Sequence, residues 1–345
     1  MNSRTFNRIV IIVIILGLVI FGGVIVHRDP FFHYHEPLRN DYYLDGAYAR
    51  YYNDGFVKFF DYDAIILGTS MCNNFKVSTL QELFGVDKAI KVNASGSFFN
   101  ETNVYLQEAF VHNSDIKLIV RGVDCDCLEL DKSEKSKFAE EAYYLRDNNV
   151  FNDVNYILNK RVMIESNKIG VVDWDEYLSW RWQPTGKQAV MSEENLYCGL
   201  IPEQKKMDDE KYHKIVDNIE ENIVMIMREN PDTNFYLFFT PYSICAWGDL
   251  LYNGDLEMQI QAQKIAIEQI LQCENVYLFS FCNNFDMVCN LDNYIDKKHY
   301  AHWINEEILH YMHEGQYQLT LDNYDEYLEE ISAFYTMYSY DKLCE

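Results

Sequence analysis

From residue 63 onwards, short apolar runs alternate with segments whose apolar residues recur at helical spacing. Runs such as "DAIILG" and "IKLIVRG" have the length and composition of buried strands, and "VSTLQELFG" has the period of an amphipathic helix. Strands that alternate with helices in this way pair in parallel through right-handed crossovers. The sequence therefore predicts an α/β fold with a five-stranded parallel sheet. The expected strands are 63–68, 89–95, 116–122, 234–241 and 275–281, and the expected helices are 77–85, 101–113, 208–227 and 258–272.

The alternation breaks between the third and fourth expected strands. This segment, about 126–207, is predicted to be a helical and aromatic insertion. Insertions at the carboxyl edge of a sheet often shape a ligand pocket, so it can form a lid or a substrate wall. Alternatively, its aromatic residues can form a small local core. The insertion includes the helical fragment "FNDVNYILNKRV" and the stretch "VDWDEYLSWRWQPTG", with Trp174, Trp180 and Trp182.

Residues 9–26, "IVIIVIILGLVIFGGVIV", are eighteen consecutive uncharged positions, which is near the minimum for a helix that crosses a bilayer. The run is longer than the core of a usual signal peptide and no small-x-small cleavage pattern follows it, so an uncleaved anchor is expected. Arg4 and Arg8 precede the run, and the first acidic residue is Asp29. By the positive-inside rule, the N-terminus is predicted to be cytoplasmic and the main domain extracytoplasmic.

These patterns predict a layout of four segments. The first, 1–28, is a cytoplasmic tip with a transmembrane anchor at the cell membrane, and the second, 29–60, is an extracytoplasmic stalk without a clear period. The α/β domain occupies 61–305 and includes the insertion. A helical C-terminal extension, 306–345, is acidic and rich in tyrosine.

The formal charge of −25 argues against a nucleic-acid partner, because a surface that binds phosphates needs clustered lysine and arginine. Nine cysteines are an odd number and show no disulfide framework. Cys125 and Cys127 are two residues apart, but no second pair of matching spacing completes a zinc site. We therefore expect mostly buried thiols and no metal site.

The first expected strand ends in "ILGTS", so that Ser70 lies at the start of a strand-to-helix turn. A serine here can cap a helix, or it can be a nucleophile at the carboxyl edge of the sheet, where α/β proteins bind ligands. A nucleophilic serine needs a base and a group that orients the base. After the fifth strand, "NYIDKKHYAHWIN" places Asp296 three residues before His299, with His302 as a rival base.

The residues "ILGTS", the glycine of "NASGS" after the second strand and "DKKHY" after the fifth resemble the SGNH, or GDSL-like, hydrolase superfamily. The resemblance covers about 61–126 and 232–305. It implies a flavodoxin-like three-layer α/β/α sandwich. It also implies that Ser70 is the nucleophile, His299 the general base and Asp296 the residue that orients the base.

The same resemblance implies an oxyanion hole with three donors. Two are the backbone N–H groups of Ser70 and Gly96, and the third is an asparagine side chain after the third strand. Here that strand ends in "RGVDCD", which places Asp124 at the asparagine position. An ionised aspartate donates no hydrogen bond, and the loss of one such donor lowers the rate by about 10²–10³. Either Asn73 or Asn100 substitutes, or the site is slow or inactive.

An active site of this kind must keep the charge of Asp124 away from the developing oxyanion. The carboxyl group can turn away, be paired, or stay protonated. Arg121 lies three residues earlier and could pair with it, and on a bent loop Asp124 could also accept backbone N–H groups and hold the turn open.

An N-terminal anchor followed by an SGNH-like domain is also similar to the layout of proteins that move acyl groups onto envelope polymers, often beside a membrane O-acyltransferase. The sequence therefore predicts a membrane-anchored serine esterase or O-acyltransferase that acts on an acylated envelope glycan or polymer without a cofactor. The alternative is a non-catalytic SGNH-like module that binds an envelope glycan or a membrane acyltransferase.

Overall fold

The computed structural model describes residues 2–39, 41–146, 149–179 and 200–343. One mixed sheet of six strands lies at its centre, in the order β2-β1-β3-β4-β5-β6. The first five strands are parallel, and β6 is antiparallel to β5. This confirms the α/β fold with five parallel strands. The strands are β1 (Ala64–Gly68), β2 (Ala89–Asn93), β3 (Leu118–Val123), β4 (Asn234–Phe239), β5 (Val276–Ser280) and β6 (Gln318–Leu319).

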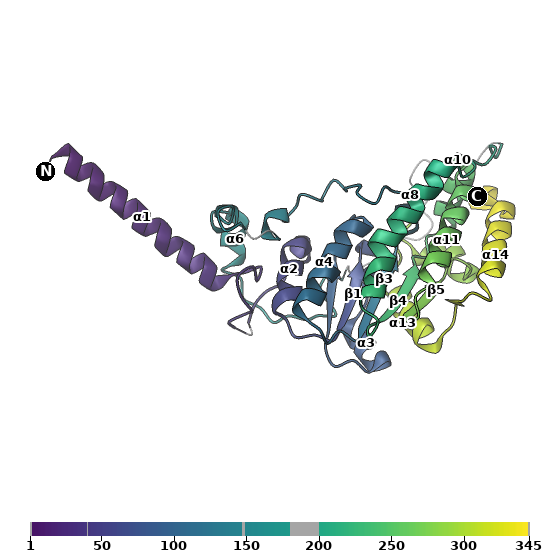
Figure 1. The fold of residues 1–345 in the computed structure, drawn as a ribbon, viewed down its shortest axis with the longest axis horizontal. Helices are drawn as coiled ribbons and strands as arrows, with labels where there is room; N and C mark the ends of the chain where they lie inside the picture. The colour runs from purple at the N-terminus through teal and green to yellow at the C-terminus, as the bar shows by residue number, and fades with distance from the viewer. Residues whose placement is uncertain (1, 40, 147–148, 180–199, 344–345) are drawn as a thin grey trace.

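Helices cover both faces of the sheet, so the fold has three layers (Figure 1). The crossovers after β2, β3 and β4 run in one direction along the sheet, and the crossover from β1 to β2 runs in the other. Because parallel crossovers are right-handed in nearly all proteins, this change of direction puts their helices on both faces of the sheet. One layer contains α4 (Phe99–His112), α8 (Asp209–Ile219), a π-helical turn (Glu220–Val224), α9 (Met225–Glu229) and α11 (Leu256–Ile270); the other contains α3 (Val77–Phe84) and α13 (His302–Glu314).

The segment after the N-terminal helix contains α2 (Ala49–Phe59), which packs against α4 and β2. No period was expected in 29–60, yet 49–59 form a helix in which eight consecutive residues, Arg50 to Val57, are buried. The buried residues include the polar side chains Arg50, Asn53 and Asp54. Gly55 lets the helix approach its neighbour, because a Cβ at this position would lie 2.5 Å from the carbonyl oxygen of Phe32.

The C-terminal segment is helical as expected, but it also supplies an unpredicted strand, β6, which adds to the edge of the sheet. The strand has only two residues, too few to show a period of two. It is followed by α14 (Tyr324–Met337), which packs against α10 (Ile244–Asn253) and α11. The shorter helices are α5 (Val154–Ile157), α6 (Lys160–Glu165) and α12 (Phe285–Cys289).

The N-terminal helix α1 (Ser3–Arg28) extends away from the rest of the chain, and α14 lies at the opposite end (Figure 1). The most apolar 18-residue window of α1 has a mean hydropathy of 3.4, and only 11% of that window is buried. Among the described residues, α1 is the one helix whose length and composition allow it to cross a membrane. A signal sequence meets the same criteria.

Candidate active site

Ser70 lies at the carboxyl edge of the sheet, where β1 ends. Thr69 caps the 3₁₀ turn Ser70–Cys72 that follows. Gly68 is required here, because a Cβ at this position would lie 2.4 Å from the sulfur of Cys72. The strand order reverses at β1 and β3, so Ser70 is at the point where open α/β sheets bind ligands.

The structure brings Ser70, His299 and Asp296 together. Ser70 Oγ is 2.8 Å from His299 Nε2, and His299 Nδ1 is 2.7 Å from Asp296 Oδ2. Burial acts to raise the pKa of Asp296, but its hydrogen bonds with His299 outweigh burial and keep the pKa below its ordinary value. The carboxylate therefore stays ionised and can hold a proton on Nδ1, which leaves Nε2 free to accept the serine proton.

The loop that carries His299 is held by contacts within the loop itself. Tyr294 and Tyr300 form an isolated antiparallel bridge on either side of the Asp296–His299 turn. Asp296 Oδ1 accepts hydrogen bonds from the backbone N–H groups of Lys298 and His299, at 2.8 and 2.7 Å. Asp296 thus orients the ring with one oxygen and shapes the turn with the other.

The rival base His302 lies in a different environment. It is exposed in the first turn of α13, and its ring contacts Trp303 with a centroid separation of 5.1 Å. His299 is the histidine whose ring contacts Ser70.

Gly96 lies in the turn between β2 and α4, with a left-handed φ of +69° that favours glycine. A Cβ at this position would also lie 3.0 Å from the ring of Phe138, a residue of the insertion. The insertion therefore covers the Gly96 turn.

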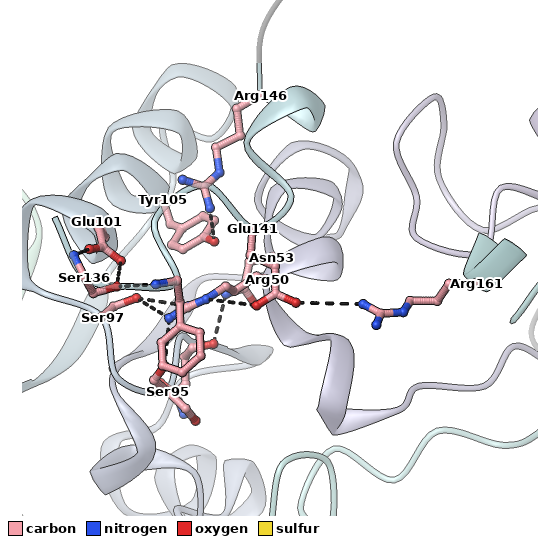
Figure 2. Close-up of polar contacts among 12 residues, drawn as sticks. Arg50, Asn53, Ser95, Ser97, Glu101, Tyr105, Ser136, Glu141, Arg146 and Arg161 are labelled. Atoms are coloured by element: carbon pink, nitrogen blue, oxygen red, sulfur yellow. Dashed lines mark hydrogen bonds and ion pairs between the residues drawn. The ribbon is translucent and has the colours of Figure 1, made fainter. Parts of the chain in front are cut away.

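Arg50 of α2 holds this turn in place, as Figure 2 shows. Its guanidinium donates to Ser97 Oγ at 2.9 and 3.1 Å and to the carbonyl oxygen of Ser95 at 2.7 Å. The side chain is 8% exposed, and its Nε lies 3.8 Å from a carboxylate oxygen of Glu141. Its guanidinium carbon also lies 5.2 Å from the ring centroid of Phe138. The residues on both sides of Gly96 are thus fixed by one buried arginine, which the sequence motifs did not reveal.

Asn73 and Asn100, the two candidates for the third donor of the oxyanion hole, have different hydrogen-bond partners. Asn73 is buried, and its Nδ2 donates to Ser95 Oγ at 3.2 Å, next to Gly96. Asn100 Nδ2 instead donates to the carbonyl oxygen of Glu134 at 3.0 Å. The amide of Asn73 is therefore beside the Gly96 turn, whereas the amide of Asn100 is bound to the insertion.

Asp124 is buried at the end of β3 and accepts a hydrogen bond from Thr69 Oγ1 at 2.6 Å. Burial, together with the charge of Asp126, raises the pKa of Asp124 to about 6. The predicted pairing with Arg121 is wrong: that guanidinium donates to the carbonyl oxygen of Phe99 at 3.5 Å. Residues an odd number apart on a strand point to opposite faces, which separates the two side chains.

Lys91 is a second buried cation near the site that the sequence did not single out. It lies in the middle of β2, and its Nζ donates to the carbonyl oxygens of Asn73 and Asp175 at 3.2 and 3.0 Å. Burial lowers its pKa to about 7. Lys91 thus joins the loop after Ser70 to the insertion.

Trp174 of the insertion belongs to an aromatic cluster with α2, where its ring centroid lies 5.1 Å from Phe56 and 5.7 Å from Tyr177. This favours the local-core alternative for Trp174. Trp180 and Trp182 lie outside the described residues.

The expectation of buried thiols is confirmed for the described cysteines, since six of the seven are buried. Both Cys125 and Cys127 are among the buried ones. In the described part of the chain, no three His, Cys, Asp or Glu side chains gather as a metal site would require.

Comparisons with known proteins add a distant similarity. No protein-family profile matches the sequence, and no curated protein is similar to it. A solved structure of a Streptococcus pneumonia protein, provisionally named a platelet activating factor, is 12% identical in sequence and aligns with a TM-score of 0.37. The alignment covers 82% of this chain and 90% of that protein. Any functional conclusion therefore rests on the geometry of the site.

Proposed function

We propose that the chain is a membrane-anchored serine esterase or O-acyltransferase of SGNH type. Its substrate would be an acylated glycan or polymer of the cell envelope, and the reaction would pass through an acyl-serine intermediate. The observation that carries the proposal is the unbroken series of contacts from Ser70 Oγ through the imidazole of His299 to Asp296. A serine that only capped a helix would need no such partners.

In the proposed reaction, Ser70 Oγ attacks the ester carbonyl while His299 Nε2 takes the hydroxyl proton. The imidazolium that forms is stabilised by Asp296. His299 then returns the proton to the leaving alkoxide as the ester bond breaks, which leaves the acyl group on Ser70. Water or a sugar hydroxyl attacks this acyl-serine with His299 again as base, and Ser70 is regenerated. No metal or organic cofactor takes part in this scheme.

The tetrahedral oxyanion would be held by the backbone N–H groups of Ser70 and Gly96. Ser70 begins a 3₁₀ turn, so its N–H has no partner within that turn. Asn73 is the best placed of the candidate third donors, because its amide lies beside the Gly96 turn.

The proposed location follows from α1 and from the residues before it. With α1 as an uncleaved anchor, Arg4 and Arg8 favour a cytoplasmic N-terminus, which leaves the site outside the cell beside the membrane. Envelope polymers are the substrates found there, and a membrane O-acyltransferase that supplies the acyl group would be a fitting partner.

One observation favours the rival function, a non-catalytic module that binds an envelope glycan or a membrane acyltransferase. Asp124 stands one residue beyond β3 and contacts Thr69, the neighbour of Ser70. When ionised, it would disfavour an oxyanion nearby.

A fluorophosphonate probe separates the two functions, because it labels only an activated serine. The purified full-length protein in detergent should be labelled, and Ser70→Ala should abolish the labelling. His302→Ala is the matched control and should be labelled like the wild type. A folded wild-type protein that stays unlabelled would favour the binding module.

A further inference from the structure

Four apolar side chains lie exposed around α5, next to the end of α1. Val150 and Phe151 precede α5 and are 72% and 88% exposed, while Val154 and Leu158, at its two ends, are 49% and 54% exposed. Val154 and Leu158 are four residues apart, which places them on the same side of α5. We call the four residues the α5 patch. Single exposed apolar residues are common, but a contiguous group of this kind marks an interaction surface.

The contacts of α5 fix the level of this patch along α1. A Cβ placed on Gly22 of α1 would lie 3.5 Å from Cγ2 of Ile157 in α5. Gly22 is six residues before the end of α1 at Arg28, which is about 9 Å along a helix axis. It is also inside the apolar run 9–26. Thus α5 lies beside the part of α1 that a bilayer would surround.

Buried hydrogen bonds hold α5 at this level. Tyr156, fully buried in α5, donates to Asp29 Oδ1 at 2.7 Å and accepts from the backbone N–H of Phe31 at 3.2 Å. Asp29 also accepts from the backbone N–H groups of His33, Tyr34 and His35, which shapes the chain where it leaves α1. The patch therefore cannot easily move away from α1.

Several charged side chains near the patch are bound within the chain. Asp153, next to Val154, accepts from Tyr34 Oη at 3.2 Å and lies 3.5 Å from His33 Nε2. Arg28, at the end of α1, donates to the carbonyl oxygen of Ser166 at 3.0 Å, and Arg161 lies 3.8 Å from Glu141. A membrane contact here therefore depends on the exposed apolar side chains and on their level along α1.

From these observations we propose that the α5 patch inserts into the same lipid bilayer as α1, as a second membrane contact. A single helix would leave the extracytoplasmic domain free to turn about one connection, whereas two contacts fix its orientation. The inference rests on the proposed anchoring by α1. The proposed partner is lipid and not a second protein, because the patch lies beside the apolar surface that α1 presents to a bilayer.

Fluorescence quenching in liposomes tests the proposal on the full chain. Reporter cysteines at Phe151 and Val154 carry an environment-sensitive dye, in a background in which Cys198, Cys289 and Cys344 are serine; the other cysteines are buried. Val19→Cys, inside α1, is the positive control. Met337→Cys is the matched negative control, because Met337 is 76% exposed and ends α14, the helix at the opposite end of the molecule from α1 (Figure 1).

We expect a nitroxide on the lipid acyl chain to quench the dyes at Phe151 and Val154 about as much as at Val19, and not at Met337. Quenching at Val19 alone, with the patch open to a water-soluble quencher, would overturn the proposal and leave the anchor intact. Patch dyes shielded from both quenchers would show that a protein surface covers them, which also overturns it. Absence of lipid quenching at Val19 would show that α1 does not lie in the bilayer, which would overturn both the proposed anchor and the proposed second contact.

Discussion

The two sides of the candidate site are held in different ways. On one side, which we call the serine side, Ser70, His299 and Asp296 contact one another directly from the loops after β1 and β5. On the other, the glycine side, Gly96 makes no such contact and its turn is fixed by Arg50 and Phe138. Reactive groups thus define the serine side, and supporting residues define the glycine side. Substitutions on the two sides should therefore differ in size and in kind.

Loss of the serine side should have the largest effect. Ser70→Ala and His299→Ala should each lower the hydrolysis of p-nitrophenyl acetate by about 10³-fold or more, and the double variant should be no slower, because residues that act as a unit are not additive. Initial rates on folded proteins measure this. A double variant much slower than either single variant would show that the two residues act separately.

Asp296→Asn should have the next largest effect. The asparagine oxygen can still accept from the backbone of Lys298 and His299, so the turn should survive. Its NH₂ group would face Nδ1 and favour the wrong imidazole tautomer, which should lower kcat by about 10²–10⁴. Steady-state kinetics and a thermal unfolding curve check both parts. If the variant keeps full activity, Asp296 only shapes the turn.

The difference between the two sides also explains what the sequence could reveal. All five parallel strands were located to within a few residues, because buried strands leave apolar runs between helical periods. Ser70, Asp296 and His299 could be singled out because reactive residue types follow strand ends at recognisable spacings. Arg50 was missed because it contacts Ser97 across 47 residues of the chain. Such contacts depend on tertiary packing, which local spacing does not encode.

Arg50→Lys tests the glycine side. Lysine keeps the charge but cannot bridge Ser95 and Ser97 as the forked guanidinium does. Loss of an oxyanion donor lowers rates by about 10²–10³. Arg50→Lys should displace the N–H of Gly96 without removing it, so we expect a smaller loss of kcat, about tenfold. KM should change little, because the oxyanion forms only in the transition state.

Arg161→Gln is the matched control for this substitution. Arg161 contacts the same Glu141, at 3.8 Å, but it belongs to the insertion and is bound to neither Ser95 nor Ser97. It should leave kcat unchanged. Equal losses in the two variants would show that Glu141, and not the Gly96 turn, transmits the effect.

Asp124→Asn should have the smallest effect on rate, because Thr69 already holds the carboxyl group and asparagine can accept the same hydrogen bond. Its clearest effect should be on stability. Burial raises the pKa of Asp124 to about 6 from an ordinary 3.8, so the folded protein favours the protonated carboxyl group. The contribution of Asp124 to folding stability is therefore complete below pH 3.8 and is lost as the pH rises through about 6. Asparagine does not ionise, so the variant should gain stability over the wild type between pH 4 and pH 7.

Melting temperatures of the two proteins across this range measure the gain. A constant difference would show that Asp124 does not titrate with folding. The rate of p-nitrophenyl acetate hydrolysis at neutral pH then compares Asp124→Asn with Arg50→Lys on the glycine side. A rise in the variant larger than the loss in Arg50→Lys would mean that Asp124 faces the oxyanion and slows the natural site. An unchanged rate would leave Asp124 as a support for the loop that carries Ser70.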